Sequence, residues 1–303
     1  MDYKIGEDLS LIRELFNLSQ DELAKILETE RITIARTETR ESYPREEFMD
    51  KFYDFCYKKG LRLNIEKEMF YKDDIKENHK LLTHASKSKI DGEISINKGR
   101  TNTDFGNGFY CSESYEKSIP YVARFPKASV YFIDFDPNNL KPIKFNVDLK
   151  WMLTIAYFRG KLDEYKNTKL VKKVLAPLKD VDYIIAPIAD NRMFDIIDTF
   201  INGEITDEQA KHSLASTNLG YQYVFISDKS IKNLKIIERC FVSTLEKEDY
   251  KKEQIKFLKI GNDKSKIARI EYKNKGKYIG EILKWKILIK MVYYSQKFKV
   301  TSS

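Results

Sequence analysis

Residues whose types and spacing suit ligand chemistry gather between positions 81 and 124. Two glycines stand two residues apart in Asp104–Ser112, which reads Asp-Phe-Gly-Asn-Gly-Phe-Tyr-Cys-Ser and ends in an aromatic run typical of a strand. Glycines let backbone approach a flat ligand where Cβ atoms would obstruct it. Farther along, Ser118 and Tyr121 are three residues apart in a segment that a proline marks as a helix start, so we expect them to share one helix face.

This arrangement predicts a pocket for a flat cationic ring. Tyr110 would come from the strand and Tyr121 from the helix, one on each face of the ring. A pyridinium held between aromatic faces gains about 1 to 2 kcal/mol of cation–π attraction where it is desolvated. The hydroxyl of Ser118 can hydrogen-bond a carboxamide beside such a ring.

The same residues resemble the ADP-ribosyltransferases of the poly(ADP-ribose) polymerase and diphtheria-toxin type. His84-Ala85-Ser86 is similar to their His-Gly-Ser, and Asp104–Ser112 is similar to their Phe-Gly-x-Gly-Ile-Tyr-Phe-Ala strand. Ser118 and Tyr121 follow Tyr110 at the spacing found in those enzymes. The chain is similar above all to an uncharacterised bacterial branch of the superfamily with a DFGxGFY motif, a Trp-bearing helix, an Ile-Ala-Asp motif and a late Gln.

The resemblance implies that NAD is the substrate and that no metal is needed. It assigns the adenosine ribose to His84, the carboxamide to the backbone of position 85, and the nicotinamide faces to the two tyrosines. Arg100, in the loop between the motifs, is either a pyrophosphate contact or a solvated loop arginine. The expected NAD-binding set is His84, Ala85, Ser86, Arg100, Phe105, Gly106, Tyr110, Ser118 and Tyr121.

The position of the catalytic glutamate of that superfamily is taken here by Gln222, in the segment Leu219–Phe225. A carboxylate stabilises the sugar cation that forms as nicotinamide leaves, whereas an amide supplies only a dipole. We therefore expect mono-ADP-ribosyl transfer or NAD hydrolysis rather than chain growth, with Asp190 as a further candidate acid. The alternatives are that Gln222 is an ordinary solvent-facing strand residue and that Asp190 is a helix N-cap.

Length and composition limit the number of domains and the classes of protein to which the chain can belong. The chain has 303 residues, of which 42% are hydrophobic, enough for about two folded domains. No apolar run reaches the ~18 residues of a membrane span, and the polar N-terminus does not read as a signal peptide, so we expect a cytoplasmic protein without membrane contact. The three cysteines form no CxxC pair, which predicts neither a disulfide framework nor a zinc site.

Residues 9–60 have helical periodicity, with a capping box at Ser19–Glu22 and further helices over 31–39 and 45–59, and we expect residues 1–72 to form a small helical bundle. Residues 19–41 resemble the helix-turn-helix of bacterial repressors. Residues 1–77 hold 14 Lys and Arg against 19 Asp and Glu, and a duplex binder usually has a basic footprint. Both DNA binding and a protein-docking or dimerising bundle remain open, and the acidic balance favours docking.

The remaining chain is predicted to form two further parts. Residues 78–240 are expected to fold as a split mixed β-sheet of the ADP-ribosyltransferase type, with strands over 128–135 and 180–189. Residues 241–303 hold 16 Lys and Arg against 7 Asp and Glu, and their lysines alternate with aromatic and apolar side chains, as in Lys284–Ile287. We expect either an amphipathic strand or surface that follows phosphates, or a solvated lysine face over a small β extension. The predicted class is α+β.

Three functions follow from these expectations. The first is an NAD-dependent mono-ADP-ribosyltransferase, acting as a bacterial toxin, phage-defence or modification factor on a protein or nucleic-acid acceptor, with an antitoxin or immunity partner. The second is an NAD glycohydrolase with the same pocket. The third is a DNA-binding regulator in which an inactive transferase fold senses NAD or ADP-ribose.

Overall fold

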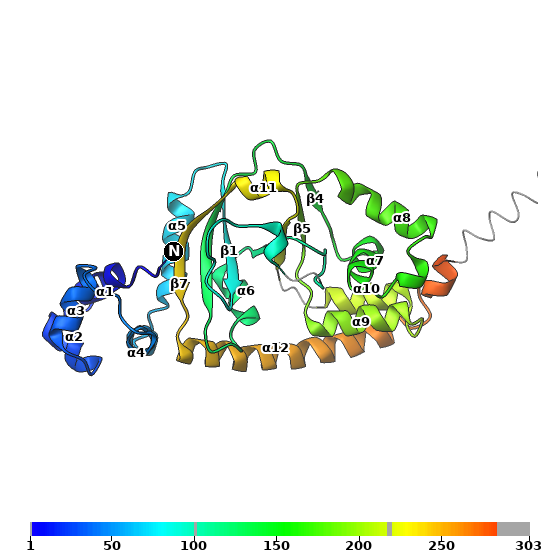
Figure 1. Ribbon diagram of the computed structural model, residues 1–303. Helices are drawn as coiled ribbons and strands as arrows, with labels where there is room; N and C mark the ends of the chain where they lie inside the picture. The colour runs from blue at the N-terminus through cyan, green and yellow to red at the C-terminus, as the bar shows by residue number, and fades with distance from the viewer. Residues whose placement is uncertain (1, 100–101, 217–219, 284–303) are drawn as a thin grey trace, which may run out of the picture. The chain divides into compact units, whose positions relative to one another are not determined.

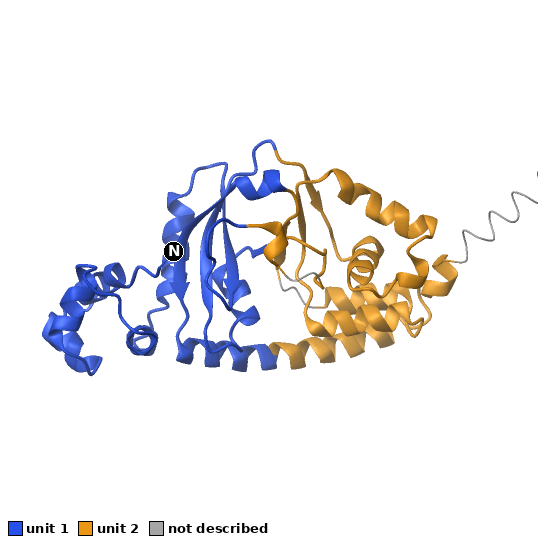
Figure 2. Ribbon diagram, viewed as in Figure 1, with its two compact units in different colours: residues 1–94, 110–139, 228–256 blue, residues 95–109, 140–227, 257–303 orange. Residues whose placement is uncertain are grey.

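The structure of the chain, a computed structural model, describes residues 2–99, 102–216 and 220–283. It is of the predicted α+β class, with helices at the N-terminus and strands of both relative orientations. The chain forms two compact units (Figure 2), the first made of residues 1–94, 110–139 and 228–256 and the second of the remainder. This division differs from the three predicted segments, because the N-terminal helices share a unit with part of the sheet.

Unit 1 begins with five helices: α1 Ile5–Leu15, α2 Gln20–Ile26, α3 Arg31–Glu38, α4 Glu46–Lys58 and α5 Leu63–Asp74 (Figure 1). The predicted capping box at Ser19 is confirmed, since its side chain accepts from Glu22 N and the Glu22 carboxylate accepts from Ser19 N. Leu9, Ile12 and Leu23 are fully buried in the core of this bundle. Helix α5 was not among the predicted helices, the last of which was expected over 45–59.

Four strands belong to unit 1: β1 Lys80–Ser86, β2 Phe109–Ser112, β3 Ser129–Phe135 and β7 Leu234–Phe241. β1 pairs with β2 on one side and with β3 on the other, and β3 pairs with β7, all antiparallel. β3 is buried along almost its whole length, as expected for an interior strand covered on both faces. Between strands lie α6 Tyr115–Ser118, the 3-10 turn η2 Ile119–Tyr121 and α11 Asp228–Lys232.

Unit 2 contains three strands, β4 Pro142–Lys144, β5 Tyr183–Pro187 and β6 Tyr221–Phe225. β4 and β5 are parallel, and β5 and β6 are antiparallel. Its helices are α7 Leu149–Phe158, α8 Lys169–Leu175, α9 Asn191–Ile201 and α10 Asp207–Ala215, with 3-10 turns η1 Ile96–Lys98, η3 Asp163–Tyr165 and η4 Ala176–Asp180. A second capping box, formed by Thr206 and Gln209, begins α10. Trp151 of α7 is fully buried, as expected.

The segment predicted as a β extension is a helix where the structure describes it. α12 runs over Thr244–Glu271, and every residue from 251 to 260 is exposed. Lysine, glutamate and leucine are good helix formers, and they dominate here over the alternation that suggested a strand. The Lys284–Ile287 motif lies outside the described residues.

The described residues show two further features, in their cysteines and in the hydrophobicity of their helices. Cys56, Cys111 and Cys240 are free and buried. Among the helices of the described residues, none combines the length and the apolar character needed to cross a bilayer.

A buried ionic cluster joins the bundle to the sheet within unit 1. The Lys67 ammonium lies 2.6 Å from Asp8 Oδ1 and 2.6 Å from Glu238 Oε1, so helices α5 and α1 and strand β7 meet at one cation. The hydroxyls of Tyr53 and Tyr71 donate to the two carboxylates. Burial works to raise the pKa of Glu238, but Lys67 outweighs it and the pKa is lowered; burial raises the pKa of Asp8.

Lys67→Met is expected to destabilise unit 1 by about 3–5 kcal/mol at neutral pH, because the buried Asp8 carboxylate would lose its cation and Glu238 would keep only Lys4, 3.5 Å away. Lys72→Met on the same helix is the control, since Lys72 is half-exposed and its i,i+4 pair with Glu68 is worth about 0.5 kcal/mol or less. Urea unfolding followed by circular dichroism measures both.

The stability difference between the wild-type protein and Lys67→Met is expected to depend on pH. A lowered carboxyl pKa contributes stability that is present at neutral pH and lost as pH falls through the folded-state value, so the gap between wild type and Lys67→Met should narrow in acid. Equal losses for the two variants at neutral pH would contradict the cluster's role.

Candidate functional site

The side chain of His84 is held by the pairing of β1 with β2. Its Nδ1 lies 2.7 Å from the carbonyl oxygen of Tyr110. A carbonyl can only accept, so Nδ1 carries the proton and the neutral ring presents Nε2 as an acceptor. Burial lowers the pKa of His84, which keeps the imidazole neutral. The ring also lies beside Tyr131 of β3, with centroids 6.3 Å apart.

Ser118 lies on the other face of β1. Its Oγ is 2.7 Å from Thr83 Oγ1, and the Thr83 hydroxyl donates to the carbonyl of Ser114 at 2.8 Å. Successive strand residues point to opposite faces, so Thr83 and Ser118 are separated from the His84 ring by the strand itself. Ser118 is only 1% exposed. The expected convergence of Ser118 with His84 around one ring is therefore not present, and Ser118 instead ties α6 to β1.

The other predicted residues of unit 1 remain near β1. Ala85 and Ser86 complete the strand and are half-buried, and Tyr110 is half-buried on the adjacent β2. Tyr121 lies in the turn η2, which contacts β1, and is 48% exposed. Ser118 and Tyr121 thus differ sharply in burial, although they were expected to share a helix face. The proline between them lies in a 3-10 turn rather than at an α-helix start.

In unit 2, Gln222 is 6% exposed on β6, so the alternative of a solvent-facing residue is wrong. Its Nε2 donates to Asp104 Oδ2 at 2.9 Å and to the carbonyl of Pro187 at 3.2 Å. The two N–H groups of the Gln222 amide are thus both engaged as donors, which fixes the orientation of the side chain. The amide oxygen Oε1 is the atom of this side chain that can accept a hydrogen bond. Burial raises the pKa of Asp104, opposed by its contacts with Arg159 and Gln222.

Arg159 forms a cluster with Asp104 and Gln222. Its Nη2 donates to Asp104 Oδ1 at 2.8 Å, and its guanidinium lies 4.0 Å from the centre of the Phe194 ring. Arg159, Phe194 and Asn102 help to line a cavity of about 170 Å³ between α7 and α9. The signal that could have marked Asp104 is its place at the head of the glycine motif.

The glycines of that motif have a different reason from the one predicted. Gly106 has φ +74°, and a Cβ there would lie 2.9 Å from a ring carbon of Phe158. A Cβ on Gly108 would lie 2.9 Å from Val224 Cγ1 and 3.0 Å from the Phe225 carbonyl. Protein atoms fill the space beside both glycines, so the motif serves close packing within unit 2 rather than the approach of a ligand at these two positions.

Three predicted site residues remain: Asp190, Phe105 and Arg100. Asp190 is the N-cap of α9, where its carboxylate accepts from Met193 N at 2.8 Å, so the N-cap alternative is confirmed. Phe105 is buried and packs against Phe145, with ring centroids 5.5 Å apart. Arg100 lies outside the described residues. Within the part of the chain that the structure describes, no group of three or more His, Cys, Asp or Glu is placed to hold a metal ion.

Gly106→Ala is expected to destabilise the protein more than Gly160→Ala. Both glycines have φ near +74°, where an L-residue costs about 1–2 kcal/mol, but nothing lies within 4 Å of a Cβ at Gly160. The contact with Phe158 should add about 1–3 kcal/mol at Gly106. Denaturant unfolding measures the difference, and equal costs would show that Phe158 does not pack against this turn.

Comparisons with known proteins place the segment from β1 to β7 in a family. Searches of curated proteins and of solved structures found no match. One family model matches residues 81–236, slightly more than half of the chain, from the second residue of β1 into β7. The match contains His84, the glycine motif and Gln222, and it leaves out the N-terminal helices and α12. The chain therefore belongs to the family described as "Protein of unknown function (DUF3990)".

Proposed function

We propose that this protein is an NAD-dependent mono-ADP-ribosyltransferase that transfers ADP-ribose to a protein or nucleic-acid acceptor and releases nicotinamide. The observation that carries the proposal is the state of His84: a half-buried, neutral imidazole whose Nδ1–H donates to the Tyr110 carbonyl. Such a ring is a hydrogen-bond acceptor at Nε2, which suits a ribose hydroxyl as donor.

The surroundings of His84 support a site for the nucleotide. Tyr110 supplies both the carbonyl that orients His84 and an aromatic ring on the strand beside it. The half-exposed Tyr121 supplies a second ring from η2. A nicotinamide between two phenol rings gains cation–π attraction while the ring is positively charged and loses it once the neutral base has formed, so the two rings favour binding of NAD and release of free nicotinamide rather than the bond-breaking step itself. Ser118 supports the site by holding β1, not by touching the carboxamide.

The proposed reaction breaks the bond between the ribose anomeric carbon and the nicotinamide nitrogen. The bonding electrons stay on nitrogen, which neutralises the pyridinium, and the sugar carries the positive charge until the acceptor's nucleophilic atom bonds to it and loses its proton. Gln222 is the residue we propose to stabilise that cation. Both of its N–H groups are engaged, so its Oε1 provides the negative end of a fixed amide dipole.

Asp190 is not retained in the proposed mechanism as a catalytic acid, because its carboxylate caps α9. Gln222 offers a fixed amide dipole, and the Asp104 carboxylate beside it is paired with Arg159, which fits a single transfer better than repeated chain growth. Water in place of the macromolecular acceptor would make the same chemistry an NAD glycohydrolase, and labelled NAD separates the two: transfer leaves label on macromolecule, and hydrolysis leaves only free ADP-ribose.

A second candidate, an NAD- or ADP-ribose-responsive regulator, is favoured by one observation in unit 1. Helices α2 and α3 are joined by a short turn in which Glu28 has φ +53°, and Ala24 is buried in the bundle core, as a helix-turn-helix requires. Tyr3, just before α1, reaches the sheet through its hydroxyl, 2.7 Å from Ser129 Oγ on β3. DNA binding that changes with NAD, without nicotinamide release, would favour this candidate.

His84→Ala is expected to weaken NAD binding by about tenfold or more, because a ribose hydroxyl would lose its acceptor. His79→Ala is the matched control, since His79 is engaged with Asp134, 2.6 Å away. Isothermal titration with NAD measures both, after circular dichroism has shown that each variant is folded. Unchanged affinity in the His84 variant would remove the proposed site.

Gln222→Ala is expected to lower the rate of nicotinamide release by about a hundredfold while NAD binding is largely kept, since the dipole acts on the transition state. Gln254→Ala, at an exposed position of α12, is the control. The rate of nicotinamide release in both variants is measured by chromatography over time. A rate equal to that of the control would show that another group stabilises the sugar cation.

A further inference from the structure

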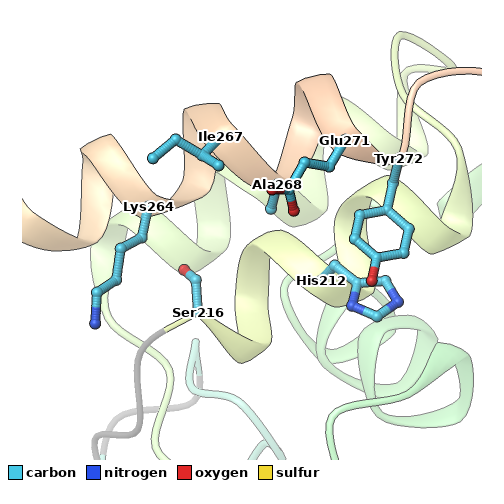
Figure 3. Close-up of a pocket in the computed structure, with 7 residues that line it drawn as sticks. All are labelled: His212, Ser216, Lys264, Ile267, Ala268, Glu271 and Tyr272. Atoms are coloured by element: carbon cyan, nitrogen blue, oxygen red, sulfur yellow. The ribbon is translucent and has the colours of Figure 1, made fainter.

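A groove in unit 2 lies between α10 and the C-terminal half of α12 (Figure 3). Its volume is about 270 Å³, and its lining residues come from both helices: His212, Ser216, Lys264, Ile267, Ala268, Glu271 and Tyr272. The rings of His212 and Tyr272 stack and close one end. This groove shares no residue with the proposed transferase site.

The two walls are held at a fixed separation. Gln209 Nε2 donates to the carbonyl of Arg269 at 2.7 Å, and Thr206 Oγ1 donates to the carbonyl of Lys275. The buried face of α12 here consists of Gly261, Ser265 and Ala268, spaced by four and three residues. Small side chains on this face let the helices approach closely, so the groove is part of the packing and persists without an occupant.

Beside the groove, α12 exposes large apolar side chains on one side. Ile260 and Ile267 are seven residues apart and therefore share a face, and Phe257 and Ile270 lie next to them. These four exposed side chains form an apolar ridge. Ile267 is 56% exposed and Ile270 is 74% exposed. Exposed apolar side chains grouped beside a groove are typical of a protein-docking surface.

The net charge of the residues around the groove and the ridge indicates which charge a partner surface would carry. Residues 207–215 and 257–283 together hold eight Lys and Arg against five Asp and Glu, and of these charged residues Lys264 and Glu271 line the groove. A second copy of this face would meet it with like charge. The chain's own residues 284–303 would do the same, since they include five lysines and no acid. The complement is an acidic apolar surface on another protein.

We propose that this groove docks an acidic amphipathic helix of a partner protein. One apolar side chain of that helix enters the groove over Ala268, the next packs on Ile267 and Ile260, and a carboxylate one turn away pairs with Lys264. Within the ridge, Ile260 and Ile267 are seven residues apart and Ile267 and Ile270 are three residues apart, so they form a continuous apolar strip against which an amphipathic helix can pack. Docking here is independent of the transferase proposal and can succeed or fail separately from it.

The test uses two fluorescein-labelled synthetic helical peptides with the same leucine positions, one with glutamate and one with lysine at the polar positions. Fluorescence anisotropy with the full chain should show that the acidic peptide binds and that the basic one does not. Ile267→Asp should weaken acidic-peptide binding by about tenfold or more, as loss of a central apolar contact does. Lys264→Glu should weaken the acidic peptide and admit the basic one.

Two controls keep the result specific. Met69→Asp changes an equally exposed apolar residue on α5, and Lys172→Glu changes an exposed lysine on α8; both should leave peptide binding unchanged. The proposal is overturned if neither peptide binds, if both peptides bind equally, or if the controls weaken binding as much as Ile267→Asp. Self-association, duplex DNA binding or binding to anionic vesicles that is lost in Ile267→Asp would assign the face to a different occupant and would also overturn it.

Discussion

The pairing of β1 with its two neighbours is the constraint on which unit 1 depends. β1 pairs with β2 and β3, and its side chains alternate between two tasks. On one face Thr83 binds Ser118 and the Ser114 carbonyl, which fixes α6 against the sheet. On the other face His84 is oriented by Tyr110. A shift of one residue in the strand would exchange these faces and remove both arrangements together.

The buried ionic cluster links this sheet to the N-terminal helices. Lys67 holds Asp8 and Glu238 from different elements, so the bundle packs on β7 through charge as well as through apolar contact. Buried ion pairs contribute little net stability, but the loss of one member is costly. This cluster therefore specifies one placement of the bundle against the strands of unit 1, which a regulatory role for the bundle would require.

Much of the local structure was predictable because its signals are local. The capping boxes at Ser19 and Thr206 use side chains three residues apart, and both are present. Helix α5 was missed because polar residues, Asn64 and Glu68, lie in its buried face and hide its periodicity. The alternating lysines suggested a strand where α12 forms, since alternation in an exposed, highly charged segment reflects solvation rather than a sheet face.

The candidate site was predictable only in part. The placement of His84 beside Tyr110 follows from the motif, whereas Ser118 was misplaced because spacing along the chain does not reveal which face of β1 a neighbour contacts. Thr83, next to His84 in sequence and opposite in direction, was the missing signal. The bond between Gln222 and Asp104 joins positions 118 residues apart, and no local pattern reports such a contact.

The central claim is that His84 is a neutral acceptor that binds the ribose of NAD. Nitrogen-15 NMR of the imidazoles tests it most directly, because the chain has three histidines and each can be assigned by substitution. We expect His84 to show the Nδ1–H tautomer at neutral pH and its Nε2 resonance to shift as NAD is added. A protonated His84, or a resonance that stays unchanged at saturating NAD, would contradict the account.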